Sequence, residues 1–156
     1  MKKMLVGMLL FVCLTSSFSA LAAEVPASRV SVDLLRDWAS EKWGTKIDKD
    51  GDLVLTIEGS KVFVSVIPKV KLIRIYTIFS AYEKRSKAEM ILLANKFNDG
   101  KRFLRVCITD SGASVCDYYM IYNGGLNSTN FFEAVDWFRV MEQDWCDFAI
   151  KGGSEK

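Results

Sequence analysis

The residues of this sequence with the most chemical potential are its cysteines, because none of its 156 residues is a histidine. Without imidazole, the chain excludes Ser-His-Asp and Cys-His catalysis and every zinc site that needs a histidine. The four cysteines, Cys13, Cys107, Cys116 and Cys146, form no Cys-x-x-Cys pair of the kind found in thioredoxin-type sites. Phosphate-binding loops, nucleophile elbows and dinucleotide-binding glycine patterns are also missing. We therefore predict a protein that is not an enzyme and that has no cofactor and no metal.

Carboxylates offer little more to build a site from. Residues 48–52, Asp-Lys-Asp-Gly-Asp, resemble a calcium loop, but the glycine comes too early and position twelve is Gly59 rather than glutamate. Glu133 and Asp136 are neighbours on an expected helix, yet both lie off its apolar stripe. We predict a turn at residues 48–52 and solvated side chains at the other two positions.

The first 22 residues are typical of a secretory signal peptide. Lys2 and Lys3 precede an apolar run over residues 4–14, and residues 20–22, Ala-Leu-Ala, form a cleavage site. The run is shorter than the roughly 20 residues that span a bilayer, so we predict no membrane insertion after the signal is removed. The mature protein would be periplasmic or secreted from a bacterial cell, and Cys13 would leave with the signal.

The charge of the mature chain argues against polyanionic partners. The full sequence has 21 Lys and Arg against 19 Asp and Glu, and cleavage removes Lys2 and Lys3, which makes the two totals equal. A neutral chain without a long run of basic residues has little electrostatic attraction for nucleic acid or for anionic membranes. We expect neither as a partner.

The remaining chain predicts one α+β domain. We expect a flexible lead-in over residues 23–29, a single domain over residues 30–150 and a disordered tail over residues 151–156. Expected helices begin at Ser31 (ending by Gly44), at Ser80 or Ser86, and near Ser128, and expected strands cover residues 52–58, 61–67, 71–79, 102–109 and 113–122. The order α-β-β-β-α-β-β-α favours an antiparallel sheet of about five strands with three helices on one face.

Loop length sets the register of each predicted hairpin. A two-residue loop at Gly59-Ser60 pairs Ile57 with Val62 and Leu55 with Val64. A two-residue loop at Ser111-Gly112 pairs Cys107 with Cys116, at a separation that suits a disulfide.

We therefore predict a disulfide between Cys107 and Cys116, which an oxidising compartment would favour and which would stabilise the fold by roughly 2–3 kcal/mol. The alternative is two free thiols. Cys146 is then an odd thiol, either reactive or packed against the core.

The same register places four large side chains on one face of the second hairpin. These are Phe103, Arg105, Tyr118 and Met120. An aromatic strip that carries an arginine on an outer sheet face is typical of a contact surface for a partner chain or peptide. The alternative is that loops or the N-terminal segment cover the strip.

Several stretches resemble the YbjN-domain family. They are residues 50–54 leading into residues 59–66, the Ala-Asn-Lys-Phe-Asn of residues 94–98, and the Asn-Gly-Gly of residues 123–125 followed by the aromatic segment 131–150. The resemblance implies a type III secretion chaperone-like fold, chaperone-like or regulatory roles, no catalytic residues, and a surface that holds another polypeptide, often in a homodimer.

We therefore expect an exported, non-catalytic module that binds a protein or peptide. One alternative is a thiol-dependent redox or stress protein that uses Cys107, Cys116 or Cys146. A second alternative is an inhibitor of an envelope enzyme.

Overall fold

A computed structural model of the chain describes residues 24–101 and 103–154. The predicted signal peptide over residues 1–22 lies outside the described residues. No helix in the described part of the chain is long and apolar enough to cross a bilayer.

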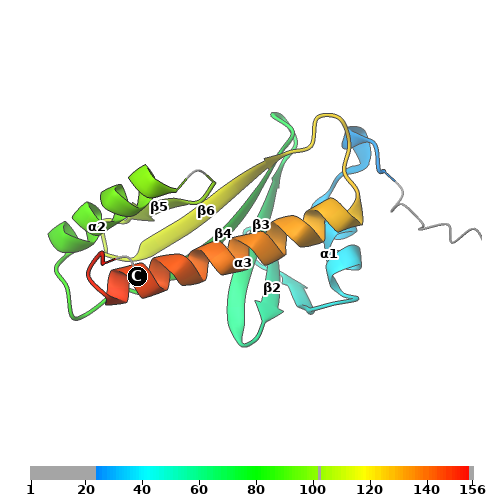
Figure 1. Cartoon of the computed structure of the whole chain (residues 1–156). Coiled ribbons are helices and arrows are strands. Elements are labelled where there is room, and N and C mark those ends of the chain that lie inside the picture. The colour runs from blue at the N-terminus through cyan, green and yellow to red at the C-terminus, as the bar shows by residue number, and fades with distance from the viewer. Residues whose placement is uncertain (1–23, 102, 155–156) are drawn as a thin grey trace, which may run out of the picture.

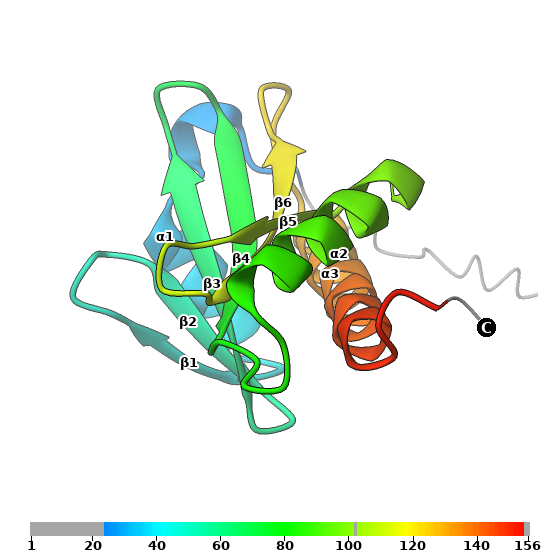
Figure 2. The same ribbon diagram turned by 90° about the vertical axis from the view of Figure 1, so that its left-hand side faces the viewer.

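The fold is a single antiparallel sheet with helices packed on one of its faces (Figure 1). Within the described residues, six strands lie in the order β1-β2-β3-β4-β6-β5. Their bounds are Gly44–Ile47, Leu53–Ile57, Ser60–Ile67, Leu72–Phe79, Arg105–Ile108 (β5) and Ser114–Ile121 (β6). Helix α1 (Val32–Ala39) and helix α3 (Ser128–Ile150) cover one face, and helix α2 (Lys87–Gly100) packs beside β5 (Figure 2). The predicted α+β class is confirmed, with one strand more than expected.

Side-chain caps fix where the helices begin. The Ser31 hydroxyl accepts from the Leu34 amide to start α1, as predicted. At α2 the capping box forms at Ser86 and not at Ser80, with Glu89 accepting from the Ser86 amide at 2.8 Å. Helix α1 ends at Ala39, and Gly44, expected to terminate it, instead begins the additional strand β1.

The loop of the first hairpin differs from the prediction without changing the faces of its strands. Glu58 and Gly59 have φ of 50° and 83° and form the two-residue turn, so that Leu55 pairs with Val62. The predicted register is therefore wrong by two residues. Because side chains alternate with a period of two, the same apolar residues still face the core.

The second hairpin differs by one residue, and here the faces exchange. The Gly112 amide donates to the Thr109 carbonyl at 3.0 Å and Gly112 has a φ of 84°, which makes a loop of three residues in place of two. Cys107 consequently pairs with Val115, and Cys116 pairs with Val106. The predicted pairing of Cys107 with Cys116 is wrong, and the two side chains lie on opposite faces of the sheet.

The core lies between the sheet and α3, which crosses the sheet along its whole length. Phe131, Val135, Phe138, Trp145 and Phe148 of α3 are buried and recur at helical spacing. On α2, Met90, Ala94 and Phe97 are buried while Ile91 and Leu92 are exposed. Phe97 joins the core through edge contacts with Trp145, with ring centroids 5.4 Å apart.

The outer edge of β5 is closed by one side chain. The Asn98 carboxamide of α2 donates to the Val106 carbonyl and accepts from the Val106 amide, both at 2.9 Å. It thereby replaces the missing neighbouring strand.

Both ends of the domain have more contacts than the sequence indicated. Within the expected flexible lead-in, Val25 exchanges two backbone hydrogen bonds with Leu126, at 2.7 and 2.9 Å. Within the expected disordered tail, Gly152 and Gly153 close α3 by donating to Ala149 and Phe148. Val25, Gly152 and Gly153 are therefore hydrogen-bonded to the rest of the domain.

One carboxylate is buried beneath α3. Glu142 is 2% exposed and is paired with Arg139, and its Oε2 has no hydrogen-bond partner among the described residues. Burial raises the pKa of Glu142, while neighbouring Thr77 and Arg139 act in the opposite direction.

We predict that Asn98→Ala lowers the free energy of unfolding by about 1–3 kcal/mol, because two backbone groups of Val106 lose their partner. Urea unfolding measures the loss, and the Val106 amide should exchange its hydrogen faster. Asn95→Ala, an exposed change on the same helix, is the control and should stay within about 0.5 kcal/mol. Equal stability of the two variants would contradict the edge-closing role of Asn98.

We predict a pH dependence of stability that comes from Glu142. Because its pKa is higher in the folded than in the unfolded chain, the folded state binds more protons between the ordinary value of 4.5 and the raised value. The contribution of Glu142 to the free energy of unfolding therefore falls as the pH rises through this interval. Glu142→Gln should remove that decline, whereas Glu133→Gln on the exposed side of α3 should not; unfolding by urea at several pH values distinguishes them.

Candidate functional site

An apolar groove of about 430 Å³ runs between α3, β6 and the segment that leads into β5. Helix α3 contributes Asn130, Glu133, Ala134, Trp137 and Met141. Strand β6 contributes Tyr118 and Met120, and Phe103 comes from the segment before β5. Three elements far apart in the sequence thus form one concave surface.

Two aromatic side chains at the groove are unusually exposed. Phe103 has 70% and Trp137 has 67% of its surface accessible to solvent. Leaving both in water is unfavourable, since burying an aromatic side chain gains roughly 1.5–3 kcal/mol. Exposed aromatics that line a groove are typical of contact surfaces.

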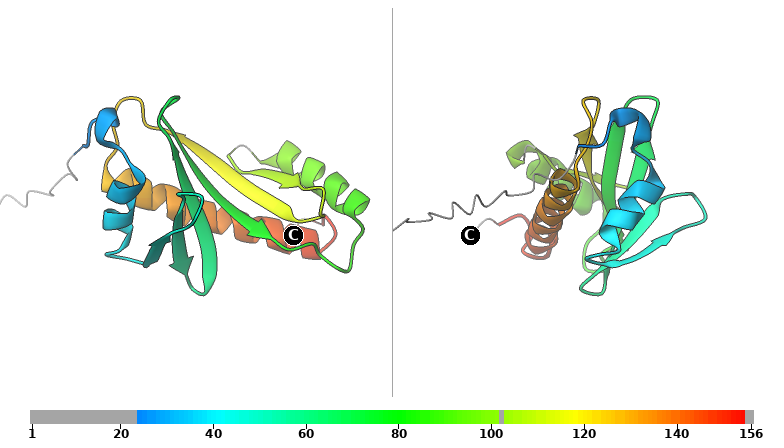
Figure 3. Two further views of the ribbon diagram at one scale, coloured as in Figure 1. Left: turned by 180° about the vertical axis from the view of Figure 1, so that it is seen from behind. Right: turned by 90° about the vertical axis from the view of Figure 1, so that its right-hand side faces the viewer.

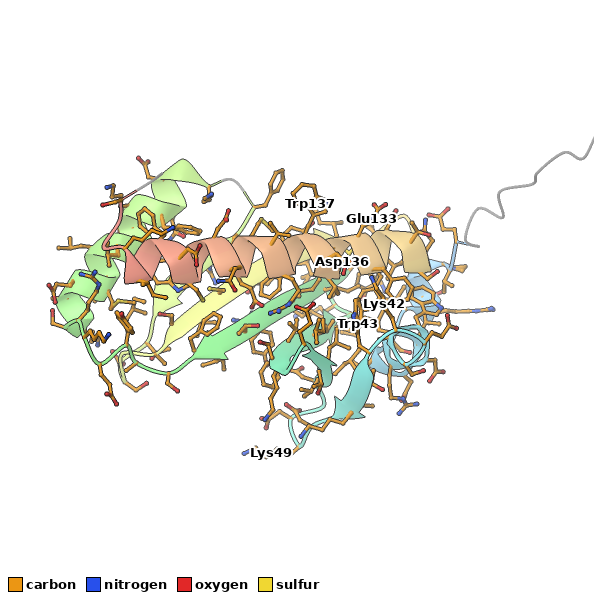
Figure 4. All side chains as sticks on the ribbon, turned by 60° about the horizontal axis from the view of Figure 1, so that its bottom comes forward. Lys42, Trp43, Lys49, Glu133, Asp136 and Trp137 are labelled. Atoms are coloured by element: carbon orange, nitrogen blue, oxygen red, sulfur yellow. The ribbon has the colours of Figure 1, made fainter. Side chains whose placement is uncertain are left out.

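The helical repeat explains which residues of α3 reach the groove. Glu133, Trp137 and Met141 recur every four residues and therefore share one side of the helix. In Figure 4, Glu133 and Trp137 lie on the same side of α3, while Asp136 points toward Lys42 on the opposite side. The core-facing residues occupy the sector between these two sides.

A second, more polar cavity of about 780 Å³ lies on the opposite side of α3. Lys42, which follows α1, bonds to Asp136 at 2.7 Å and lies over the Trp43 ring. Arg139 lies 3.7 Å from Glu58 across this cavity. Four of its charged groups, Lys42, Asp136, Arg139 and Glu58, are thus paired in two ion pairs within the cavity.

The structure separates the predicted contact surface into two parts. Phe103, Tyr118 and Met120 come together in the groove. Arg105 lies on the other face of the sheet, where it pairs directly with Asp117 of β6. The register difference of one residue in the second hairpin separates Arg105 from Tyr118 and Met120, and Phe103 reaches the groove because it precedes β5.

The three cysteines of the described residues are free, and their surroundings differ. Burial, with Cys146 and Glu142 nearby, raises the pKa of Cys116. Burial, with Glu142 and Asp147 nearby, raises the pKa of Cys146 to about 11. Both thiols therefore stay protonated at neutral pH and are weak nucleophiles. Cys107 is exposed.

The described residues contain no cluster of three or more His, Cys, Asp or Glu side chains that could hold a metal. The region 48–52 is the predicted turn, in which Asp48 Oδ1 accepts from the amides of Asp50 and Asp52 at 2.9 and 3.0 Å. The groove can thus make mainly apolar contacts with a ligand, and one carboxylate, Glu133, lies at its margin.

Sequence reasoning found the strand residues of the groove and missed the helix residues. Trp137 was outside the apolar stripe of α3, and its isolation on the polar side was the signal that could have marked it. Met141 is half-buried at the groove.

Comparison with known proteins gives the fold and the family. No curated protein matches the sequence. A solved structure described as "Crystal structure of YbjN, a putative transcription regulator from E. coli" superposes with a TM-score of 0.61, covers 74% of this chain and 88% of its own, and is 11% identical. At that identity the likeness shows the fold. The family model described as "YbjN: Putative bacterial sensory transduction regulator" matches residues 31–147, so the chain belongs to the YbjN family.

Proposed function

We propose that this protein is an exported, non-catalytic binding module that holds an apolar segment of another polypeptide in the groove beside α3. The observation that carries the proposal is the pair of exposed aromatic side chains, Phe103 and Trp137, at the two sides of a groove floored by Tyr118 and Met120. The family description as a sensory transduction regulator is consistent with regulated binding in place of catalysis.

The groove has the size and chemistry of a binding site. Its volume of about 430 Å³ falls within the range of roughly 300–1,000 Å³ that is common for ligand sites. Large aromatic and sulfur-containing side chains dominate its lining, and Trp, Tyr and Met are enriched in protein interfaces. Met120 and Met141 can adapt to different apolar side chains.

Charge defines the second feature of the partner. Glu133 is the only ionisable acid or base among the groove-lining residues apart from the Tyr118 phenol. A partner segment with a basic residue beside its apolar side chains would therefore gain an ion pair at this end of the groove. Because Glu133 is exposed, we expect that pair to affect the rate of association more than the affinity.

The thiol alternative receives less support than binding. Cys116 and Cys146 have raised pKa values, and Cys107 is exposed on the face away from the groove. An inhibitor of an envelope enzyme would use the same groove and differs only in the identity of the partner.

Site-specific crosslinking tests the groove. A photoreactive amino acid at Glu133, at the groove margin, should crosslink the mature protein to a polypeptide in bacterial envelopes. The same group at Lys49, which lies at a distant tip of the molecule (Figure 4), should give no such product. Adding Trp137→Ala should reduce the crosslink about tenfold or more, the size of effect expected for an aromatic interface anchor. Val140→Ala, an exposed change on the same helix outside the groove, should leave it unchanged.

The stability of the Trp137→Ala variant must be measured alongside. Because Trp137 is largely exposed, its free energy of unfolding should change by less than about 0.5 kcal/mol. Crosslinks that persist in Trp137→Ala, or that appear equally from Lys49, would contradict binding in the groove. A crosslink to a second copy of the chain would show that the protein binds itself and forms a homodimer.

Export is tested by the N-terminus of the protein made in bacteria. Cleavage after Ala22 should give a chain that begins at Ala23 and is recovered from the periplasm or the medium. This cut leaves Val25 and its two hydrogen bonds to Leu126 in place. Recovery of an uncut chain from the cytoplasm would overturn the exported part of the proposal.

A further inference from the structure

No helix of the described residues lies over the sheet face opposite α1 and α3 (Figures 2 and 3). Near its middle lie Arg74 and Tyr76 of β4, Asp117 and Tyr119 of β6, and Arg105 of β5, which we call the open-face strip. Cross-strand pairing aligns Tyr76, Asp117 and Arg105 in one row and Arg74 with Tyr119 in the next. The strip is thus fixed by the register of three neighbouring strands.

Two arginines share one carboxylate at the centre of the strip. Arg74 Nη2 donates to Asp117 Oδ2 at 3.0 Å. Arg105 donates through Nε to Oδ1 at 3.2 Å and through Nη2 to Oδ2 at 3.1 Å. Asp117 is 1% exposed even though it lies on an uncovered face. The Asp117 carboxylate is therefore paired within the strip, and its hydrogen bonds orient both guanidinium groups.

Aromatic rings hold the two guanidinium groups from the sides. The Arg74 guanidinium carbon lies 4.3 Å from the Tyr76 ring centroid and 6.0 Å from that of Tyr119. The Arg105 guanidinium carbon lies 5.9 Å from the Tyr119 centroid. Tyr76 is itself anchored, because its hydroxyl donates to Asp52 Oδ2 at 2.6 Å. Burial and Asp52 raise the pKa of Tyr76, so the hydroxyl remains a donor.

The two arginines of the strip have more N–H donors than the strip has acceptors. Each guanidinium has five N–H donors, and Nη1 of both arginines makes no hydrogen bond to any described residue. Nε of Arg74 is buried without a partner among those residues. Arg105 has 60% of its side chain exposed, so its free edge faces solvent.

We propose that the open-face strip binds a carboxylate of an acidic peptide segment, with an apolar neighbour of that carboxylate resting on Tyr119. A carboxylate fits the planar donor edge of a guanidinium, and two arginines against the single carboxylate of Asp117 leave one positive charge within the strip, with Asp52 at its margin beside Tyr76. Exposed Ile121, two residues beyond Tyr119 on the same face, offers contact to the next side chain of an extended peptide. The balanced charge of the chain after residue 22 disfavours a polyanion. This site is separate from the groove and does not rest on the proposed function.

The probe is a blocked pentapeptide with one glutamate between two phenylalanines, titrated into the folded domain and followed by amide chemical shifts. The glutamate peptide should bind at least about tenfold more tightly than its glutamine counterpart, with shifts confined to β4, β5 and β6. Arg105→Gln should weaken binding about tenfold, and Arg105→Lys should weaken it less because the charge remains. Lys101→Gln, which removes a half-buried cation that is paired with Asp144 outside the strip, should have no effect.

Each contrary result overturns the assignment. Equal binding of the two peptides, no binding of either, or shifts that map to α3 would exclude a carboxylate site on the open face. Inorganic phosphate that binds as tightly as the glutamate peptide would indicate a general anion site instead of a peptide site. A dimer that dissociates in Arg105→Gln would show that a second copy occupies this face. The amide spectrum also verifies that each variant is folded.

Discussion

The three-residue loop of the second hairpin is the constraint on which both candidate surfaces depend. Gly112, with its positive φ, closes a turn that pairs Arg105 with Asp117 across β5 and β6. This register sends Tyr118 and Met120 toward α3 and leaves Arg105 on the uncovered face. A loop shorter by one residue would exchange these faces, burying a guanidinium under α3 and removing the partner of a buried carboxylate. Either change would cost several kcal/mol.

Two surfaces with different chemistry therefore lie on opposite faces of one sheet. The groove is apolar and adaptable, and its rim carries a single carboxylate. The open-face strip is charged, and Asp117 and the Tyr76 ring fix its guanidinium groups while one edge of Arg105 faces solvent. The described residues of both surfaces contain no cluster of His, Cys, Asp or Glu side chains that could hold a metal.

How well the sequence predicts the faces of the sheet depends on the alternation of side chains along each strand, which repeats every two residues. For the first hairpin, the predicted register was wrong by two residues, but the predicted core face was right. Side chains alternate with a period of two, so Leu55 and Val62 still face the core. For the second hairpin, the predicted register was wrong by one residue, which places the side chains of Cys107 and Cys116 on opposite faces of the sheet. The structure therefore has free cysteines at the two positions where a disulfide was predicted. Trp137 was overlooked because its contacts depend on how α3 crosses the sheet, and β1 because four residues with only one large apolar side chain carry little strand signal.

Hα–Hα nuclear Overhauser effects across β5 and β6 test the register most directly. In an antiparallel sheet the Hα atoms of residues in non-hydrogen-bonded pairs approach closely. Because the Thr109 amide bonds the Ala113 carbonyl, the following non-hydrogen-bonded pairs are Ile108 with Ser114 and Val106 with Cys116. The structure predicts a strong contact between the Hα atoms of Val106 and Cys116. A strong contact between the Hα atoms of Cys107 and Cys116 would instead indicate a two-residue loop. It would contradict the assignment of residues to both surfaces.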